Sequence, residues 1–111
     1  MKIERQTVGT VEILAPQGVL SEDDADEFSA LLQERLCGAN PRVVISLQEV
    51  PYLDSAALNG LIVAADELID RGVRLKLVST CATCREILEL TGLSSRFQFF
   101  ETPQDAVRSF L

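Results

Sequence analysis

Residues 43–68 read VVISLQEVPYLDSAALNGLIVAADEL, and this stretch decides the fold. It opens with the run from Val43 to Leu47, which is apolar and rich in β-branched residues, as in a strand buried on both faces. Further along, apolar residues recur at intervals of three and four, the pattern of a helix that lies on a sheet. These residues are Leu58, Leu61, Ile62, Ala65, Leu68 and Ile69. The stretch therefore predicts a buried strand, a short connection and an amphipathic helix.

The connection between strand and helix ends in the pair Asp54-Ser55. Both residue types favour the start of a helix, where backbone N–H groups have no partner within the helix. A hydroxyl at such a place lies where an anion is stabilised, and a serine can acquire an anionic group by phosphorylation. Ser55 is therefore a candidate phosphorylation site. Its simpler interpretation is helix capping, worth about 1 kcal/mol.

The flanking segments predict the remaining elements. Before the central stretch we expect an antiparallel strand pair over 2–14, turned near Gly9, and a helix that begins at a Ser21–Asp24 capping box and ends at Gly38. After it we expect a strand over 74–78, a helix capped by Ser79 or Thr80 and closed by Gly92, a strand over 97–100, and a helix begun by Thr102-Pro103. The residues expected to face the core from the first, third and last helices are Ala25, Phe28, Leu31 or Leu32, Leu36, Cys84, Ile87, Leu88, Thr91, Ala106, Val107 and Phe110. The order β-β-α-β-α-β-α-β-α predicts an α/β domain with a mixed, mostly parallel sheet and helices packed on it.

Length and charge limit the functional classes. The 111 residues suffice for one domain with a single core. The net charge is −7, and the densest positive cluster, Arg71, Arg74 and Lys76, forms no basic run. This composition argues against nucleic acid and against an anionic membrane surface as partners. No apolar run approaches the roughly 20 residues of a membrane span, and residues 1–5 show no signal-peptide core, so we expect a cytoplasmic protein.

Residues for catalysis are scarce. The sequence has no histidine, which removes the commonest general base and metal ligand and excludes Ser-His-Asp and Cys-His sites. Neither a G-x-x-x-x-G-K-[ST] loop nor a G-x-G-x-x-G turn occurs, so no nucleotide site is indicated. The acids Glu22, Asp23, Asp24, Asp26 and Glu27 are typical of a solvated face near the positive end of a helix. We therefore expect no enzymatic activity and no cofactor.

The cysteines allow two interpretations. Cys81 and Cys84 form a C-x-x-C at a predicted helix start, where thiolates are stabilised and redox motifs occur. The same spacing places both sulfurs on the helix face that carries Leu88, where a buried cysteine packs as a small apolar residue. A structural zinc site needs four ligands, and Cys37 is the only other cysteine. We expect no metal, and both buried thiols and a redox pair remain open.

The chain resembles the STAS family, named after sulfate transporters and anti-sigma factor antagonists, over essentially its full length. The resemblance rests on Val43–Leu47 followed by Val50–Ser55, supported by Gly72–Val78 and Ile87–Leu93. The block from Ile87 onward, with Phe97 and the closing helix, is similar to the C-terminal half of bacterial anti-sigma factor antagonists. The resemblance implies a single STAS domain over residues 1–111, with the element order already predicted.

It also implies a function in partner switching. In such proteins an unphosphorylated antagonist binds an anti-sigma factor that is also a serine kinase, and a sigma factor is freed. The kinase phosphorylates a serine at the start of the second helix, and a PP2C-type phosphatase restores the binding form. Ser55 matches that serine, and the partner-binding residues implied are Tyr52, Asp54, Ser55, Ala56, Leu58 and Asn59. Strand-end packing is the alternative role for Tyr52.

The sequence departs from the family pattern around this serine. The typical motif is Asp-Ser-Ser/Thr-Gly, whereas Ala56 and Ala57 hold its last two positions here. We expect Ala57 to place a Cβ where a partner backbone approaches, and Ser21 and Ser46, which replace common acids, to alter the charge near Ser55. These departures keep a second hypothesis open, a non-phosphorylated STAS subunit that regulates a partner ATPase such as that of a lipid-transporting ABC system. The oligomeric state is also open, because the edge of the first strand is able to pair with another chain.

Overall fold

The computed structural model of the protein describes residues 2–18, 22–36, 41–51, 55–80 and 82–110, without the side chains of Glu22, Asp23, Ala25 and Cys84. Its elements follow the predicted order, with one added 3-10 helix, η1, before the last strand. They are β1 (Lys2–Val8), β2 (Val11–Gln17), α1 (Glu22–Leu36), β3 (Val43–Ser46), α2 (Ser55–Ile69), β4 (Leu75–Val78), α3 (Ala82–Leu90), η1 (Ser94–Arg96), β5 (Phe97–Phe100) and α4 (Pro103–Arg108).

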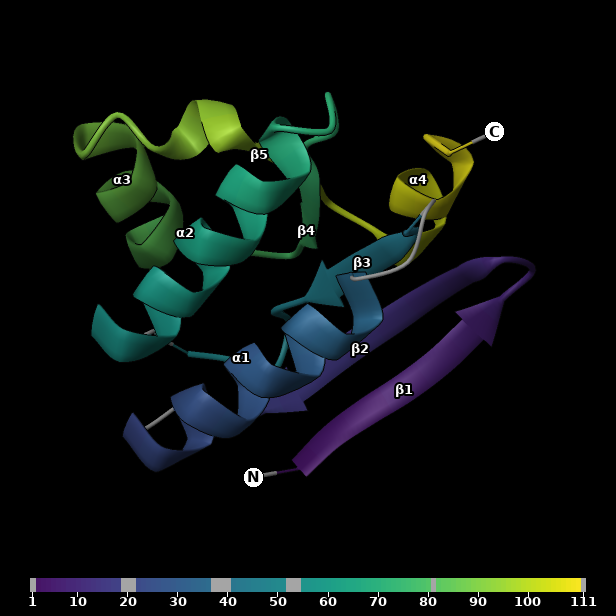
Figure 1. Cartoon of the computed structure of the whole chain (residues 1–111), viewed down its shortest axis with the longest axis horizontal. Helices are drawn as coiled ribbons and strands as arrows, with labels where there is room; N and C mark the ends of the chain where they lie inside the picture. Colours follow the sequence, from purple (N-terminus) through teal and green to yellow (C-terminus); the bar gives the residue numbers. More distant parts are fainter. Residues whose placement is uncertain (1, 19–21, 37–40, 52–54, 81, 111) are drawn as a thin grey trace.

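The five strands form one sheet in the order β1-β2-β3-β4-β5. β1 and β2 are antiparallel and joined by a tight turn, in which Gly9 has the positive φ of +61° that favours glycine. The other neighbouring strands are parallel, because a helix crosses over between each pair. The prediction of an α/β domain with a mixed, mostly parallel sheet is therefore confirmed (Figure 1).

The sheet is covered unequally on its two faces. The main core contains Val43 and Ile45 of β3 and Leu47 directly after it, together with buried residues of α1, α2 and α3. Val44 points to the other face, where it packs in a smaller cluster with Ala106 of α4. All four residues of β3 and all four of β4 are buried, as expected for strands covered on both faces. The single six-residue helix α4 nevertheless leaves part of the second face uncovered along β1.

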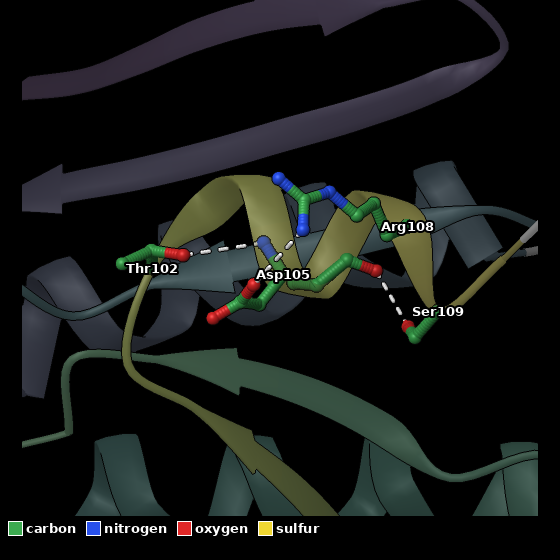
Figure 2. A network of polar contacts seen from close by, with 5 residues as sticks. Thr102, Asp105, Arg108 and Ser109 are labelled. Carbon is green, nitrogen blue, oxygen red and sulfur yellow. Dashed lines mark hydrogen bonds and ion pairs between the residues drawn. The ribbon is translucent and has the colours of Figure 1, made fainter.

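Two helix ends agree with the signals in the sequence, the start of α4 and the end of α3. The Thr102 hydroxyl accepts a hydrogen bond from the Asp105 backbone N–H at 3.2 Å, which confirms the predicted cap of α4 (Figure 2). Gly92, just after α3, adopts a positive φ of +75°. The N–H of Leu93 then donates back to the Leu88 carbonyl in the last turn of the helix, a glycine-based helix end as predicted. Ser21 and Gly38 lie outside the described residues.

The predicted interior face of α3 is partly wrong. Leu88 is fully buried, but Ile87 is 40% exposed and Thr91 is exposed, with its hydroxyl donating to the Ile87 carbonyl at 2.8 Å. The helix is short and lies at the margin of the domain, chiefly beside η1, so few of its positions reach the core. Ser79 is not at the cap position of α3, because the helix begins three residues later at Ala82; its hydroxyl donates to the Glu101 carbonyl at 3.0 Å.

Lys76 is the unexpected interior residue. It lies on β4 and is only 7% exposed, although the sequence grouped it with Arg71 and Arg74 as a positive cluster. Its ammonium donates to the Gln98 side-chain oxygen at 2.7 Å and lies 5.4 Å from the Phe100 ring centre and 4.7 Å from that of Phe110. The charge is thus held by an amide and two aromatic faces.

Burial lowers the pKa of Lys76 from its ordinary value of 10.5. The unfolded chain therefore binds more protons than the folded protein as the pH approaches 10.5, and this lysine should make stability rise with pH in that range. We expect the free energy of unfolding of the wild type to increase with pH relative to that of Lys76→Met, measured by urea denaturation from pH 8 to 10.5. Parallel pH profiles for the two proteins would contradict this assignment.

Candidate functional site

Ser55 is the first residue of α2, and it is exposed. The helix starts at the carboxyl edge of the parallel strands, because it follows β3 through a short connection. The N-terminal ends of α1, α2 and α3 lie on the same side of the molecule (Figure 1). Such an edge is where open α/β sheets commonly bind their ligands.

Helix α2 is firmly anchored behind this serine. Its fully buried or nearly buried residues are Ala57, Leu61, Ala64, Ala65 and Leu68. They form one stripe against the main core, which directs Ser55 and Asn59 to the solvent. The position of Ser55 is therefore fixed by the packing of the whole helix.

The predicted contact residues divide into three groups. Ser55 and Asn59 are exposed, and Ala56 is half-buried beside them. Leu58 is also half-buried and packs against the main core, so it offers only part of its side chain to a partner. Tyr52 and Asp54 lie outside the described residues.

A groove between α1 and α2 begins beside Ser55. Its volume is about 350 Å³, and Ala56 and Asn59 are among its lining residues. The remaining lining residues are Asp26, Ser29, Gln33, Gly60 and Val63. None of these five residues was predicted from the sequence as part of the site; a glycine inside a helical pattern, as at Gly60, was the available signal of close backbone approach.

Gly60 sets the spacing of the two helices. A Cβ added to Gly60 would overlap the Ser29 hydroxyl and lie 3.4 Å from the Ser29 Cβ. The floor of the groove thus depends on two small residues, one from each helix. Their contact brings the acidic first half of α1 next to the helix that carries Ser55.

This contact leads to a stability prediction. Alanine is favoured over glycine in a helix interior by about 1 kcal/mol, but at position 60 we expect the overlap with Ser29 to cancel that gain. In a Ser29→Ala background the gain should reappear, giving a coupling of about 1 kcal/mol between Gly60→Ala and Ser29→Ala. Urea denaturation of the four proteins measures the coupling, and strictly additive effects would show that the two positions do not restrict each other.

The surface beside Ser55 carries an acid and no basic residue of α2. Asp26 is exposed on α1 and lines the groove with Ala56 and Asn59, and the sequence of α2 contains no Lys or Arg. Arg35 is the one basic residue of α1, and its guanidinium lies 3.4 Å from the carboxylate of Glu12 on β2. Neither helix therefore offers a basic residue dedicated to neutralising an anion on Ser55.

Two of the expected consequences of the sequence departures are wrong. Ala57 is fully buried in the main core, so its Cβ does not face a partner. Ser46 is 6% exposed and follows Ile45 on β3, which places it on the sheet face opposite α2. It therefore does not contribute to the surface around Ser55. Ser21 lies outside the described residues.

The cysteine pair remains untested, because Cys81 and the side chain of Cys84 are outside the described part of the chain. Among the described residues, no group of three or more His, Cys, Asp or Glu side chains is arranged to hold a metal ion. Within that same part of the chain, every helix is too short or too polar to cross a membrane.

Comparison with known proteins bears on this geometry. The sequence profile of the STAS domain matches residues 2–106. The chain belongs to the STAS domain family. This match confirms the resemblance seen in the sequence. The matched range includes Ser55 at the start of α2.

Several similar proteins are named as anti-sigma factor antagonists, some of them provisionally. BtrV of Bordetella bronchiseptica, provisionally named as one, is 26% identical over 110 residues, covering 99% of this chain and 95% of BtrV. TM1081 of Thermotoga maritima, also provisionally named, superposes with a TM-score of 0.84 at 21% identity, covering 96% of this chain and 92% of that one. SpoIIAA of Bacillus in its phosphorylated form superposes with a TM-score of 0.78 at 16% identity, covering 99% of this chain and 100% of that one.

The fold and the general class follow from these matches. The structures share the fold of this chain, and the sequence match makes it an antagonist-like STAS protein at modest identity. The prediction of a non-enzymatic regulator is confirmed at the level of this class. SpoIIAA is known in phosphorylated and unphosphorylated forms, a property that belongs to SpoIIAA itself.

Proposed function

We propose that this STAS protein is a cytoplasmic anti-sigma factor antagonist whose binding to an anti-sigma factor is switched off by phosphorylation of Ser55. The observation that carries the proposal is the exposed Ser55 hydroxyl on the first turn of a firmly anchored helix, at the carboxyl edge of the sheet. A protein kinase needs an accessible hydroxyl, and a binding switch needs that hydroxyl at a contact surface.

The contact surface in this proposal is the N-terminal part of α1 and α2, with Ser55, Ala56 and Asn59 near its centre. The exposed carboxylate of Asp26 in the groove suits a basic group on the partner. Leu58 contributes the exposed part of its side chain, and we infer from the family motif that Tyr52 and Asp54 complete the surface.

The switch would be electrostatic. A phosphoryl group adds about −1.5 to −2 charges at neutral pH. The one basic residue of α1, Arg35, pairs with Glu12, and α2 has none, so no ion pair within these two helices would neutralise the phosphoryl charge. It would instead repel or sterically exclude the partner while the buried stripe of α2 keeps its packing. The anti-sigma factor would be the serine kinase, and a PP2C-type phosphatase would restore the binding form.

The proposal is tested by purifying the tagged protein with its partner from the native host. The complex should contain a serine kinase, and added Mg-ATP should release the antagonist together with the appearance of phosphate on Ser55. A complex that is unaffected by Mg-ATP, or that contains an ATPase of a transport system in place of a kinase, would contradict the proposal.

A further inference from the structure

The second face of the sheet carries a groove far from Ser55 in the fold. It lies between the β1–β2 hairpin and α4, on the face opposite α1 and α2, and its volume is about 360 Å³. This volume falls within the range of small-molecule sites. The groove exists because α4 has only six residues and covers the central strands while leaving β1 uncovered.

The lining of the groove is amphipathic. Val8, Ile13, Pro103 and Val107 form its apolar part, and Val8 is among the exposed large apolar residues of the protein at 38% exposure. The polar part consists of the side chains of Gln6, Gln104 and Arg108. An apolar surface with a few polar groups at its rim is typical of sites for small amphiphilic ligands.

Among the described residues, Arg108 is the only charged one that lines the groove, in a protein of net charge −7. It projects from α4 on the side of the hairpin (Figure 2). Its one ion pair among the described residues is a loose one, with 3.8 Å between the guanidinium and the Asp105 carboxylate, and its side chain is 75% exposed. The Asp105 carboxylate would repel an anionic ligand. At 3.8 Å from the Arg108 guanidinium, however, it leaves guanidinium N–H groups available to donate to that ligand. The adjoining hollow adds Glu4 and Arg5, whose charges cancel.

From this lining we infer a second binding site, for a small aliphatic carboxylate of medium chain length. The carboxylate would accept hydrogen bonds from Arg108, and the chain would lie on Val8, Ile13 and Val107. The inference is independent of the proposed function, because the site is on the opposite face of the sheet from Ser55.

The test is a titration of the full-length protein with sodium octanoate below its micelle concentration, followed by ¹⁵N–¹H correlation spectra. We expect saturable shifts of the backbone amides of Gln6, Val8, Ile13, Val107 and Arg108. Arg108→Gln should weaken binding by about fivefold, the effect of losing one exposed ion pair. Val8→Ser should weaken it as well, because it removes apolar lining.

Two controls keep the test decisive. Arg74→Gln removes the same charge from an exposed residue outside the groove and should leave binding unchanged. Octylammonium, with the same chain and the opposite charge, should bind more weakly than octanoate. Equal weakening by Arg74→Gln and Arg108→Gln, equal binding of octylammonium, or shifts that do not cluster at the groove would overturn the inference.

Discussion

Ser55→Glu is expected to weaken binding of the anti-sigma factor by at least about thirtyfold, equivalent to about 2 kcal/mol. The carboxylate would stand at an exposed position next to the groove that already bears Asp26, with no basic residue in α2. Ser55→Ala should bind as tightly as the unphosphorylated wild type and should no longer be released by Mg-ATP. Calorimetry or surface plasmon resonance with the purified partner measures both effects.

Asn59→Asp is the matched control for this experiment. It adds one negative charge to the same exposed face of α2, one turn from Ser55 and in the groove. If the effect depends on the position of the charge at Ser55, Asn59→Asp should weaken binding less than Ser55→Glu. Equal affinities of Ser55→Glu and the wild type would contradict the switch mechanism.

Leu61→Ala is expected to lower the free energy of unfolding by about 3 kcal/mol. Leu61 is fully buried in the main core and belongs to the stripe that anchors α2 to the sheet. Its truncation removes apolar burial and leaves a cavity under the helix that presents Ser55. Urea denaturation followed by circular dichroism measures the change.

Leu90→Ala provides the comparison, because the same chemical change is made on α3 at a residue that is 80% exposed. We expect it to change the free energy of unfolding by less than about 0.5 kcal/mol. A similar cost at both positions would show that α2 is not anchored by its buried stripe.

The order of elements was predictable because it depends on signals close together in the chain. Val43–Leu47 is a short, mostly apolar run. Gly9 lies in the turn between the first two strands, and Thr102 directly precedes the last helix. Ser55 was located for the same reason, since the start of α2 follows directly from the strand and the helix stripe around it.

The features that were missed depend on contacts between distant residues. Lys76 is interior because Gln98, Phe100 and Phe110, more than twenty positions later, surround its ammonium. The α1–α2 groove depends on the approach of Ser29 to Gly60. The exposure of Ile87 could not be read from helical spacing, which gives a stripe but not the extent of the sheet beneath it.

Phosphate occupancy of Ser55 in the native host tests the central claim most directly. Cleavage after Arg42 and Arg71 places Ser55 in one tryptic peptide, which also contains Ser46, so fragment ions must separate the two serines. Ser46 is almost fully buried, and we therefore predict phosphate on Ser55 alone, at a level that changes with growth conditions. Ser55 unmodified under every condition while a partner still co-purifies would contradict the switch and would favour a constitutive binding subunit.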